Sequence, residues 1–243
     1  MSRVLGMQQS TLPFRYLGIN LFKGRNRPLY YMHLLEKVEA RLQGWQWKLL
    51  SPGGRLVLIK HVISSIPLFT ASSVLLPKQT ERSLESKFAN FFWGMDSGRP
   101  KRHWISWRNL CLPEAEGGLG VRSLATIQQS SSAKLLFNLL RGGSLWSDFM
   151  DAAYINGSHT TTSLTWKRMQ QARDFVDQHI QITEEAVIWT LAPLGDFTTA
   201  TAYEALRPKS WCQLVFRLHL ETRNPLEDLN IYVEVASSIP ALP

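Results

Sequence analysis

Proline and glycine divide residues 28–93 into segments of helical periodicity, and this division constrains the fold more than any other feature of the sequence. In the first segment Pro28 suits the opening turn of a helix and Gly44 suits its end. The apolar side chains between them recur at the spacing of one helix face: Leu34, Leu35, Val38 and Leu42. The pattern predicts an amphipathic helix that begins near Pro28.

The second segment carries a strong start signal. Ser51 can cap a helix with its side chain, and Pro52 fits the first-turn position, so we expect a helix over 53–65. One face of this helix is apolar, through Leu56, Ile59, Val62, Ile63 and Ile66, and Arg55, Lys60 and His61 lie off that face. Pro67 should break or kink the helix, with a further helical piece to Leu76.

Two more helices are expected over 79–93 and 124–140, ended by Gly94 and by Gly142 with Gly143. The first of them has a predicted buried stripe of Leu84, Phe88, Phe91 and Phe92, with Glu81, Arg82, Glu85 and Lys87 outside. The sequence therefore predicts a mainly α fold, a helical bundle preceded by a short β-strand or turn. The C-terminal segment is poorly defined, either α+β or disordered.

Weaker patterns complete the assignment. The alternation of residues 103–107 favours a short strand. Residues 166–179 favour a helix whose inward side chains are Trp166, Met169, Phe175 and Val176. Residues 195–207 favour a short strand that leads into a helix. Residues 208–243 form no convincing unit and are predicted to be a divergent tail, with disorder as one option. The expected divisions are 1–27 (tail and turn), 28–95 (helical domain), 96–142 (connection with a glycine-rich turn and helix), 143–165 (linker), 166–207 (a further segment) and 208–243 (tail).

The net charge of +8 is concentrated in the first half of the chain. Residues 1–110 hold 17 Lys and Arg against 5 Asp and Glu, residues 111–180 hold 6 against 6, and residues 181–243 hold 4 against 8. Trp45, Trp47, Trp93, Trp104 and Trp107 lie within the basic half. This combination fits a surface that binds a polyanion and stacks on bases, and it fits equally a solvated basic surface over core tryptophans.

Several classes of protein are disfavoured. No run reaches the roughly 18 uninterrupted apolar residues of a membrane span, and the N-terminus lacks a secretion-signal pattern. Cys111 and Cys212 lie far apart in a chain without secretory features, which favours a reduced intracellular compartment and leaves nucleus or cytoplasm open. We expect no membrane association, and the oligomeric state is not indicated.

No catalytic or metal-binding set can be assembled from the sequence. Only five acids precede residue 110: Glu36, Glu39, Glu81, Glu85 and Asp96. Most of the first four fall on predicted outer helix faces, where Lys or Arg can pair with them. The histidines and cysteines do not follow zinc-ligand spacing, and the glycines of 117–120 match neither a P-loop nor a dinucleotide fingerprint. We therefore predict no catalytic residues, no metal and no cofactor.

Residues 12–25 combine an apolar and aromatic run with Gly18 and Gly24, followed by Arg25 and Arg27, a layout suited to a turn that meets phosphate. Ordered motifs follow, namely residues 44–50, 54–60 (Gly-Arg-Leu-Val-Leu-Ile-Lys), 64–67 (Ser-Ser-Ile-Pro) and 116–120 (Glu-Gly-Gly-Leu-Gly). Together they resemble the plant non-LTR, LINE-type retrotransposon reverse transcriptases, from just downstream of the catalytic motif. The resemblance covers residues 12–141.

The resemblance implies a set of parts for this chain. Residues 14–22 resemble the primer grip and residues 28–93 the helical thumb, followed by the family's connection. The segment 195–203 resembles the start of the reverse-transcriptase zinc-binding region, but the chain departs from the family after Trp211, without the metal ligands, which suggests a truncated or degenerate copy. The paired aspartates that hold two divalent metals in a polymerase are absent, so no enzymatic activity is expected.

Nucleic-acid contacts are implied for one set of residues by the same resemblance: Tyr16, Gly18, Lys23, Arg25, Arg27, Arg55 and Lys60. The expected partner is RNA or an RNA-DNA duplex, bound weakly and without sequence specificity, or a missing palm domain. Core packing for Tyr16 and a surface charge for Arg55 remain alternatives, and the tryptophans are more often core residues than stacking platforms. The alternative function is a helical protein-interaction or structural domain with no nucleic-acid role.

Overall fold

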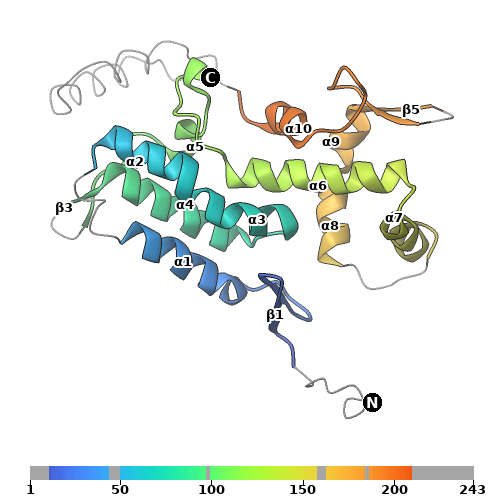
Figure 1. The fold of residues 1–243 in the computed structure, drawn as a ribbon, viewed down its shortest axis with the longest axis horizontal. Coiled ribbons are helices and arrows are strands. Elements are labelled where there is room, and N and C mark those ends of the chain that lie inside the picture. The colour runs from blue at the N-terminus through green and yellow to red at the C-terminus, as the bar shows by residue number, and fades with distance from the viewer. Residues whose placement is uncertain (1–10, 44–49, 97–98, 158–162, 184–185, 210–243) are drawn as a thin grey trace, which may run out of the picture.

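The computed structural model describes residues 11–43, 50–96, 99–157, 163–183 and 186–209. The fold is mainly α, as the sequence predicted, and the described strands form only short antiparallel pairs. Figure 1 shows α1, α2, α3 and α4 side by side at one end of an elongated molecule, with α7, α8 and α9 at the other end. We call residues 28–96 the N-terminal bundle and residues 143–209 the C-terminal lobe.

A β-hairpin precedes the bundle. Strand β1 (Phe14–Tyr16) pairs with β2 (Ile19–Leu21) in register Phe14 to Leu21. Both turn residues have positive φ, +48° at Leu17 and +87° at Gly18, which matches the right-handed twist of the strands and favours glycine. The predicted short β-strand or turn at the start of the fold is therefore a complete hairpin.

The bundle helices begin where the sequence placed them. The 3-10 helix η1 (Pro28–Tyr31) leads into α1 (Met32–Leu42), and α2 (Pro52–Leu58) opens with Pro52 in its first turn. The Gly54 N–H donates to Ser51 Oγ over 3.2 Å, so Ser51 is the predicted cap. The expected stop at Gly44 lies outside the described residues.

A π-helical turn lies just before Pro67 in the sequence. The π-helix η3 (Ile59–Ile63) separates α2 from α3 (Ser65–Ser73), and the Ser64 N–H bonds the Ile59 carbonyl at 3.0 Å. A proline has no N–H for the carbonyl four residues earlier, and its ring crowds that carbonyl, so the wider turn relieves the conflict. Helix α3 ends at Ser73, short of the predicted Leu76, because Val74 is extended.

The run from α2 through α3 bears on the expectation of no membrane association but does not decide it. Pro52–Ser73 is 22 residues long with a mean hydropathy of 1.4, which suffices by length and composition for a span. A third of its apolar window is buried inside the structure, where α3 packs against α1 and α6. A core helix of a soluble protein meets the same criteria, so this single run is weak grounds for a span.

Helix α4 (Lys78–Trp93) ends at Gly94, as predicted. Of its predicted stripe, Leu84, Phe88 and Phe91 are buried and Phe92 is half-buried. Glu81 was expected outside but is only 5% exposed. It remains close to Lys78, whose Nζ lies 3.4 Å from its carboxylate, and a partner of this kind reduces the cost of burying a charge.

The connection after α4 differs from the prediction. Strands β3 (Met95–Asp96) and β4 (Arg99–Pro100) pair, and the strand expected over 103–107 is replaced by an irregular segment leading into the short helix α5 (Trp107–Leu110). Ser106 is the N-cap of α5, so its side chain bonds the first turn of a helix instead of taking part in a strand. The 3-10 helix η4 (Glu114–Glu116) precedes Gly118, where a Cβ would meet the Leu112 carbonyl oxygen at 2.0 Å.

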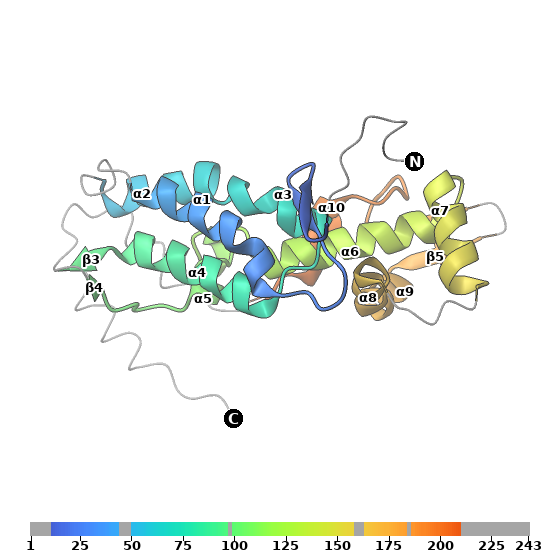
Figure 2. The same cartoon turned by 90° about the horizontal axis from the view of Figure 1, so that it is seen from below.

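Helix α6 (Leu124–Arg141) runs along the molecule and was predicted almost to the residue. Its first turns pack into the core of the N-terminal bundle through Leu124 and Ile127. Its later turns supply the cores of the C-terminal lobe through Ala133, Leu136 and Phe137. Figure 2 shows α6 extending from the bundle to α7.

The C-terminal lobe contains more helix than the sequence predicted. Residues expected to be a linker form α7 (Leu145–Met150), capped by Ser144, and the π-helix η5 (Asp151–Ile155). The expected helix over 166–179 divides into α8 (Leu164–Gln171) and α9 (Arg173–Gln178). Met169 and Val176 are buried in it as predicted, with Trp166 and Phe175 partly buried.

The strand predicted to begin at Gly195 is absent. The hairpin lies earlier, as β5 (Ile180–Ile182) and β6 (Val187–Trp189). Helix α10 (Thr199–Leu206) follows a segment of turns in which the Gly195 carbonyl accepts a hydrogen bond from the Trp189 N–H at 2.8 Å. Short strands without clear alternation are hard to recognise from sequence alone. The predicted tail over 208–243 lies outside the described residues from residue 210 onward.

Candidate nucleic-acid interface

The hairpin β1–β2 is attached to the bundle through Asn20 on β2 and through Phe22, which follows β2. Phe22 stacks on Tyr30 with ring centroids 4.5 Å apart, and the Asn20 amide donates to the Tyr30 carbonyl. The turn itself approaches α3, because a Cβ at Gly18 would lie 3.6 Å from Cε1 of Phe69. Tyr16, a predicted site residue, is 58% exposed on this hairpin and is therefore not a core residue.

The basic loop after the hairpin, residues 23–27, is fixed by Asn26. The Asn26 amide donates to the Leu75 carbonyl over 2.7 Å, and the Tyr31 hydroxyl donates to Asn26 Oδ1 over 3.0 Å. Burial raises the pKa of Tyr31, so its hydroxyl stays protonated and available as a donor. Leu75 lies just before α4, so Asn26 places the basic loop beside the N-terminus of that helix.

Three predicted site residues lie on this loop. Lys23, Arg25 and Arg27 are exposed, and none of them forms a salt bridge with any residue that the structure describes. The N-terminal end of a helix adds partial positive charge from its unpaired N–H groups. The loop and the start of α4 therefore form one site of positive potential, which we call the basic loop site.

His33 on α1 lies near the hairpin. Burial lowers the pKa of His33, and the positive charges of Arg15 on β1 and of Lys37 lower it further, against opposing effects of the Tyr30 carbonyl and of Glu36. Burial and the neighbouring cations disfavour protonation of the imidazole.

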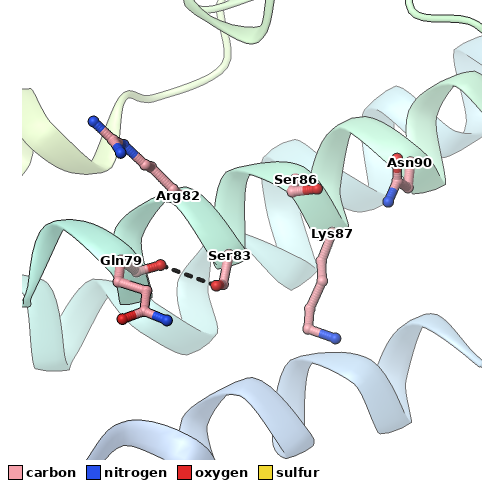
Figure 3. A pocket seen from close by; sticks show the side chains of 6 residues that line it. All are labelled: Gln79, Arg82, Ser83, Ser86, Lys87 and Asn90. Carbon is pink, nitrogen blue, oxygen red and sulfur yellow. Dashed lines mark hydrogen bonds between the residues drawn. The ribbon is translucent and has the colours of Figure 1, made fainter. Parts of the chain in front are cut away.

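The exposed face of α4 continues from the basic loop site as a polar groove of about 630 Å³. Its lining side chains are all polar: Gln79, Arg82, Ser83, Ser86, Lys87 and Asn90. In Figure 3 Lys87 points toward the neighbouring helix and Arg82 points to the opposite side of α4. Lys87 is paired with Glu39 at 2.7 Å, which leaves Arg82 as the groove's cation without a described salt-bridge partner.

The structure separates the other two predicted residues from this site. Arg55 is half-buried, and its Nη1 lies 3.5 Å from the Phe92 carbonyl, at the C-terminal end of α4. A cation there interacts favourably with the helix dipole. Lys60 pairs with Glu114 at 2.8 Å. The sequence showed that both lie off the apolar face of their helix but not which neighbours they would meet.

A second basic cluster lies at the far end of α4 and was not among the predicted site residues. The Lys101 N–H bonds the Gly94 carbonyl at 3.0 Å, and His103 stacks on Trp93 with ring centroids 6.4 Å apart. The Arg102 guanidinium lies 5.0 Å from the ring centroid of Trp104. The sequence signal for this cluster was the basic run beside two tryptophans.

Acidic side chains meet in pairs in the described part of the chain, as Glu116 and Glu204 do on Arg207. No group of three His, Cys, Asp or Glu side chains among these residues could hold a metal ion. Glu39, Glu81 and Glu114 each lie in a salt bridge with a lysine. The arrangement offers positive charge and exposed aromatic surface.

Comparison with known proteins gives two plant relatives. The chain is 37% identical over 122 residues to an Arabidopsis thaliana protein provisionally named a ribonuclease H protein, a match that covers 50% of this chain and 20% of that protein. It is 26% identical over 123 residues to an uncharacterised mitochondrial protein of Arabidopsis thaliana, covering 47% of this chain and 80% of that protein. The chain thus matches only a fifth of the length of the first relative.

Other comparisons place no constraint on the family. No protein-family model matches the chain. No solved structure matches it either.

Proposed function

We propose that this chain is a non-catalytic part of a LINE-type reverse transcriptase that binds RNA or an RNA-DNA duplex through the phosphate backbone. The ordered motifs between residues 12 and 120 support the family, and the two plant relatives fit a reading frame derived from a retroelement. In this proposal the hairpin corresponds to the primer grip, the N-terminal bundle to the thumb, and residues 166–207 to the start of the zinc-binding region.

The observation that carries the proposal is the basic loop site. Asn26 holds the loop against the bundle, and Lys23, Arg25 and Arg27 extend into solvent without described salt bridges. A phosphate bound there displaces no ion pair between residues that the structure describes. Phosphate contacts of this kind provide affinity and orientation without reading base sequence.

The proposal also includes the absence of polymerase activity. Two-metal catalysis needs carboxylates that can approach the same pair of cations, and this chain has no Asp-Asp dipeptide. A primer-extension assay with the purified chain and Mg²⁺ should give no product above background. Extension that depends on a carboxylate of this chain would overturn this part of the proposal.

Salt-dependent binding tests the phosphate contacts. Fluorescence anisotropy with an RNA-DNA duplex should show affinity that falls steeply between roughly 50 and 200 mM salt. The double variant Arg25→Ala with Arg27→Ala should reduce the slope of log affinity against log salt by about 2, since each phosphate contact contributes about 0.9 for B-form DNA.

The matched control removes two exposed lysines from the other half of the molecule, as Lys134→Ala with Lys167→Ala. This control should leave the slope close to that of the wild type. Affinity that does not change with salt, or equal effects of the two double variants, would refute binding at the basic loop site.

A protein-interaction function is a second candidate, favoured by one observation. Leu145 is 91% exposed and Phe149 is 65% exposed on α7. The exposed face of a surface helix normally carries polar residues. Size-exclusion chromatography with and without RNA separates the two functions. Self-association that is abolished by Leu145→Glu, with no RNA-dependent change in elution, would favour the second candidate.

A further inference from the structure

We infer that residues 101–104 form a second nucleic-acid contact, in which Trp104 stacks on an unpaired base. The inference rests on the proposed function and specifies its ligand: a duplex that carries a single-stranded extension. The two contacts lie at opposite ends of α4, because Asn26 ties the basic loop to Leu75 before its start and the Lys101 N–H bonds the Gly94 carbonyl at its end. Figures 1 and 2 show β3 at that end of α4.

Trp104 has the exposure that stacking requires. Its side chain is 41% exposed, whereas a tryptophan used only for packing would be covered. The Arg102 guanidinium lies over the ring at 5.0 Å, which is within the range of a cation–π contact. An arginine and an aromatic ring side by side provide a charge for the phosphate and a flat surface for the base.

The segment is held at both ends, so little ordering is needed when a ligand binds. On one side the Lys101 N–H bonds the Gly94 carbonyl and His103 stacks on Trp93. On the other side the Asn109 N–H donates to Ser106 Oγ over 3.3 Å and fixes the start of α5. A rigid aromatic platform loses less conformational entropy on binding than a free loop does.

Charge around Trp104 favours a polyanion over an apolar protein partner. Arg99, Lys101, Arg102 and Arg108 are exposed, and no salt bridge joins them to another described residue. The Arg55 guanidinium approaches the same end of α4 through its contact at Phe92. Arg102 thus lies over the exposed ring, and Arg99, Lys101 and Arg108 are within five residues of it in the sequence, which is the composition of single-strand binding sites.

The length of α4 sets the spacing of the two contacts. Its 16 residues correspond to about 24 Å. A duplex bound at the basic loop site and along the polar groove would therefore reach its last base pairs near Trp104. Only an unpaired base beyond the duplex exposes a face for stacking.

The test compares a blunt RNA-DNA duplex with the same duplex carrying a six-nucleotide single-stranded extension on either strand. Fluorescence anisotropy should show tighter binding of one extended probe. Trp104→Ala should weaken that binding by roughly tenfold and leave the blunt duplex unchanged, because stacking contributes about 1–3 kcal/mol per base. Trp104→Phe should keep most of the gain.

Trp146→Ala is the matched control, since Trp146 on α7 is similarly exposed at 37%. It should behave as the wild type with every probe. Equal weakening of blunt and extended probes by Trp104→Ala, or no weakening at all, would overturn the inference.

The outcomes also separate this inference from the proposed function. Salt-dependent binding of the blunt duplex with no gain from an extension would leave the proposed function standing and refute the second contact. Binding of a single strand that needs Trp104 but not Arg25 and Arg27 would support the second contact and refute the basic loop site. Failure of the wild type to bind any probe would refute both.

Discussion

Trp189 in the C-terminal lobe and Trp104 beside the N-terminal bundle belong to the same residue type but have opposite environments. Trp189 is fully buried, with Phe197 at 4.6 Å, Phe175 at 5.9 Å and Phe137 at 6.1 Å between ring centroids. Its indole N–H donates to Thr201 Oγ1 over 3.0 Å. Trp104 has 41% of its surface exposed and forms a cation–π contact with Arg102.

The arginines of the two regions differ in the same way. Arg168 on α8 is 2% exposed, and its guanidinium donates to the Ser72 and Ser73 carbonyls and to Ser132 Oγ. Burial lowers its pKa to about 10. Arg25 and Arg27 are exposed and have no described salt bridge. Both comparisons teach that the groups facing a side chain, more than its type, decide whether it stabilises the fold or remains available to a ligand.

Measurements of unfolding free energy test the comparison of the two tryptophans. Trp189→Ala should lower the free energy of unfolding by about 3–5 kcal/mol, because it removes a large side chain from a closed aromatic cluster. Trp104→Ala should change it by about 0.5 kcal/mol or less. Urea denaturation followed by circular dichroism measures both, and similar losses would show that Trp104 is a packing residue.

The arginine comparison gives the next largest effect. Arg168→Met keeps much of the side-chain volume but leaves the Ser72 and Ser73 carbonyls without their donor, at a cost of about 1–3 kcal/mol in the free energy of unfolding. Arg173→Met on α9 is the control, since Arg173 pairs with Asp177 near the surface and should cost about 0–1 kcal/mol. Equal effects would remove the distinction between buried and exposed arginines.

The smallest expected effect concerns Glu85 on α4. Burial raises the pKa of Glu85, and the nearby Glu81 raises it further against an opposing effect of Lys78. A carboxyl whose pKa is higher in the folded state destabilises the fold when it is ionised. This penalty is absent below the ordinary pKa, grows as the pH rises, and is complete above the folded-state pKa.

Glu85→Gln should therefore raise the melting temperature at pH 7, and the gain should disappear as the pH falls toward 4. Glu36→Gln on the exposed face of α1 is the control and should show no such trend. Thermal unfolding across this range measures the difference. A gain for Glu85→Gln that is independent of pH would contradict an electrostatic origin.

Local signals explain what the sequence predicted correctly. Helix starts and ends at Pro28, Ser51 and Gly94 depend on capping and backbone geometry within a few residues, and these are legible in the sequence. The burial of Glu81 depends on neighbours brought close by tertiary packing, and the three-residue strands of the hairpin β5–β6 are too short to show an alternating pattern. Periodicity alone contains no such information.

The same limit applies to the candidate site. Lys23, Arg25 and Arg27 were predicted from the basic layout after the aromatic run and from the family resemblance, and they lie on one loop of the structure. Arg55 and Lys60 were grouped with them through the family resemblance, but α4 and η4 supply other contacts for both. Asn26 was missed because its role depends on Leu75, which lies 49 residues away.

Helix α6 has a consequence for how the molecule unfolds. Because its 18 residues contribute to the core of the bundle and to both cores of the C-terminal lobe, neither half has a complete core without the other. Local opening of either half would expose one side of α6 to solvent. Loss of structure should therefore spread along α6 as a single cooperative transition, and the two halves are one unit of folding despite their different surfaces.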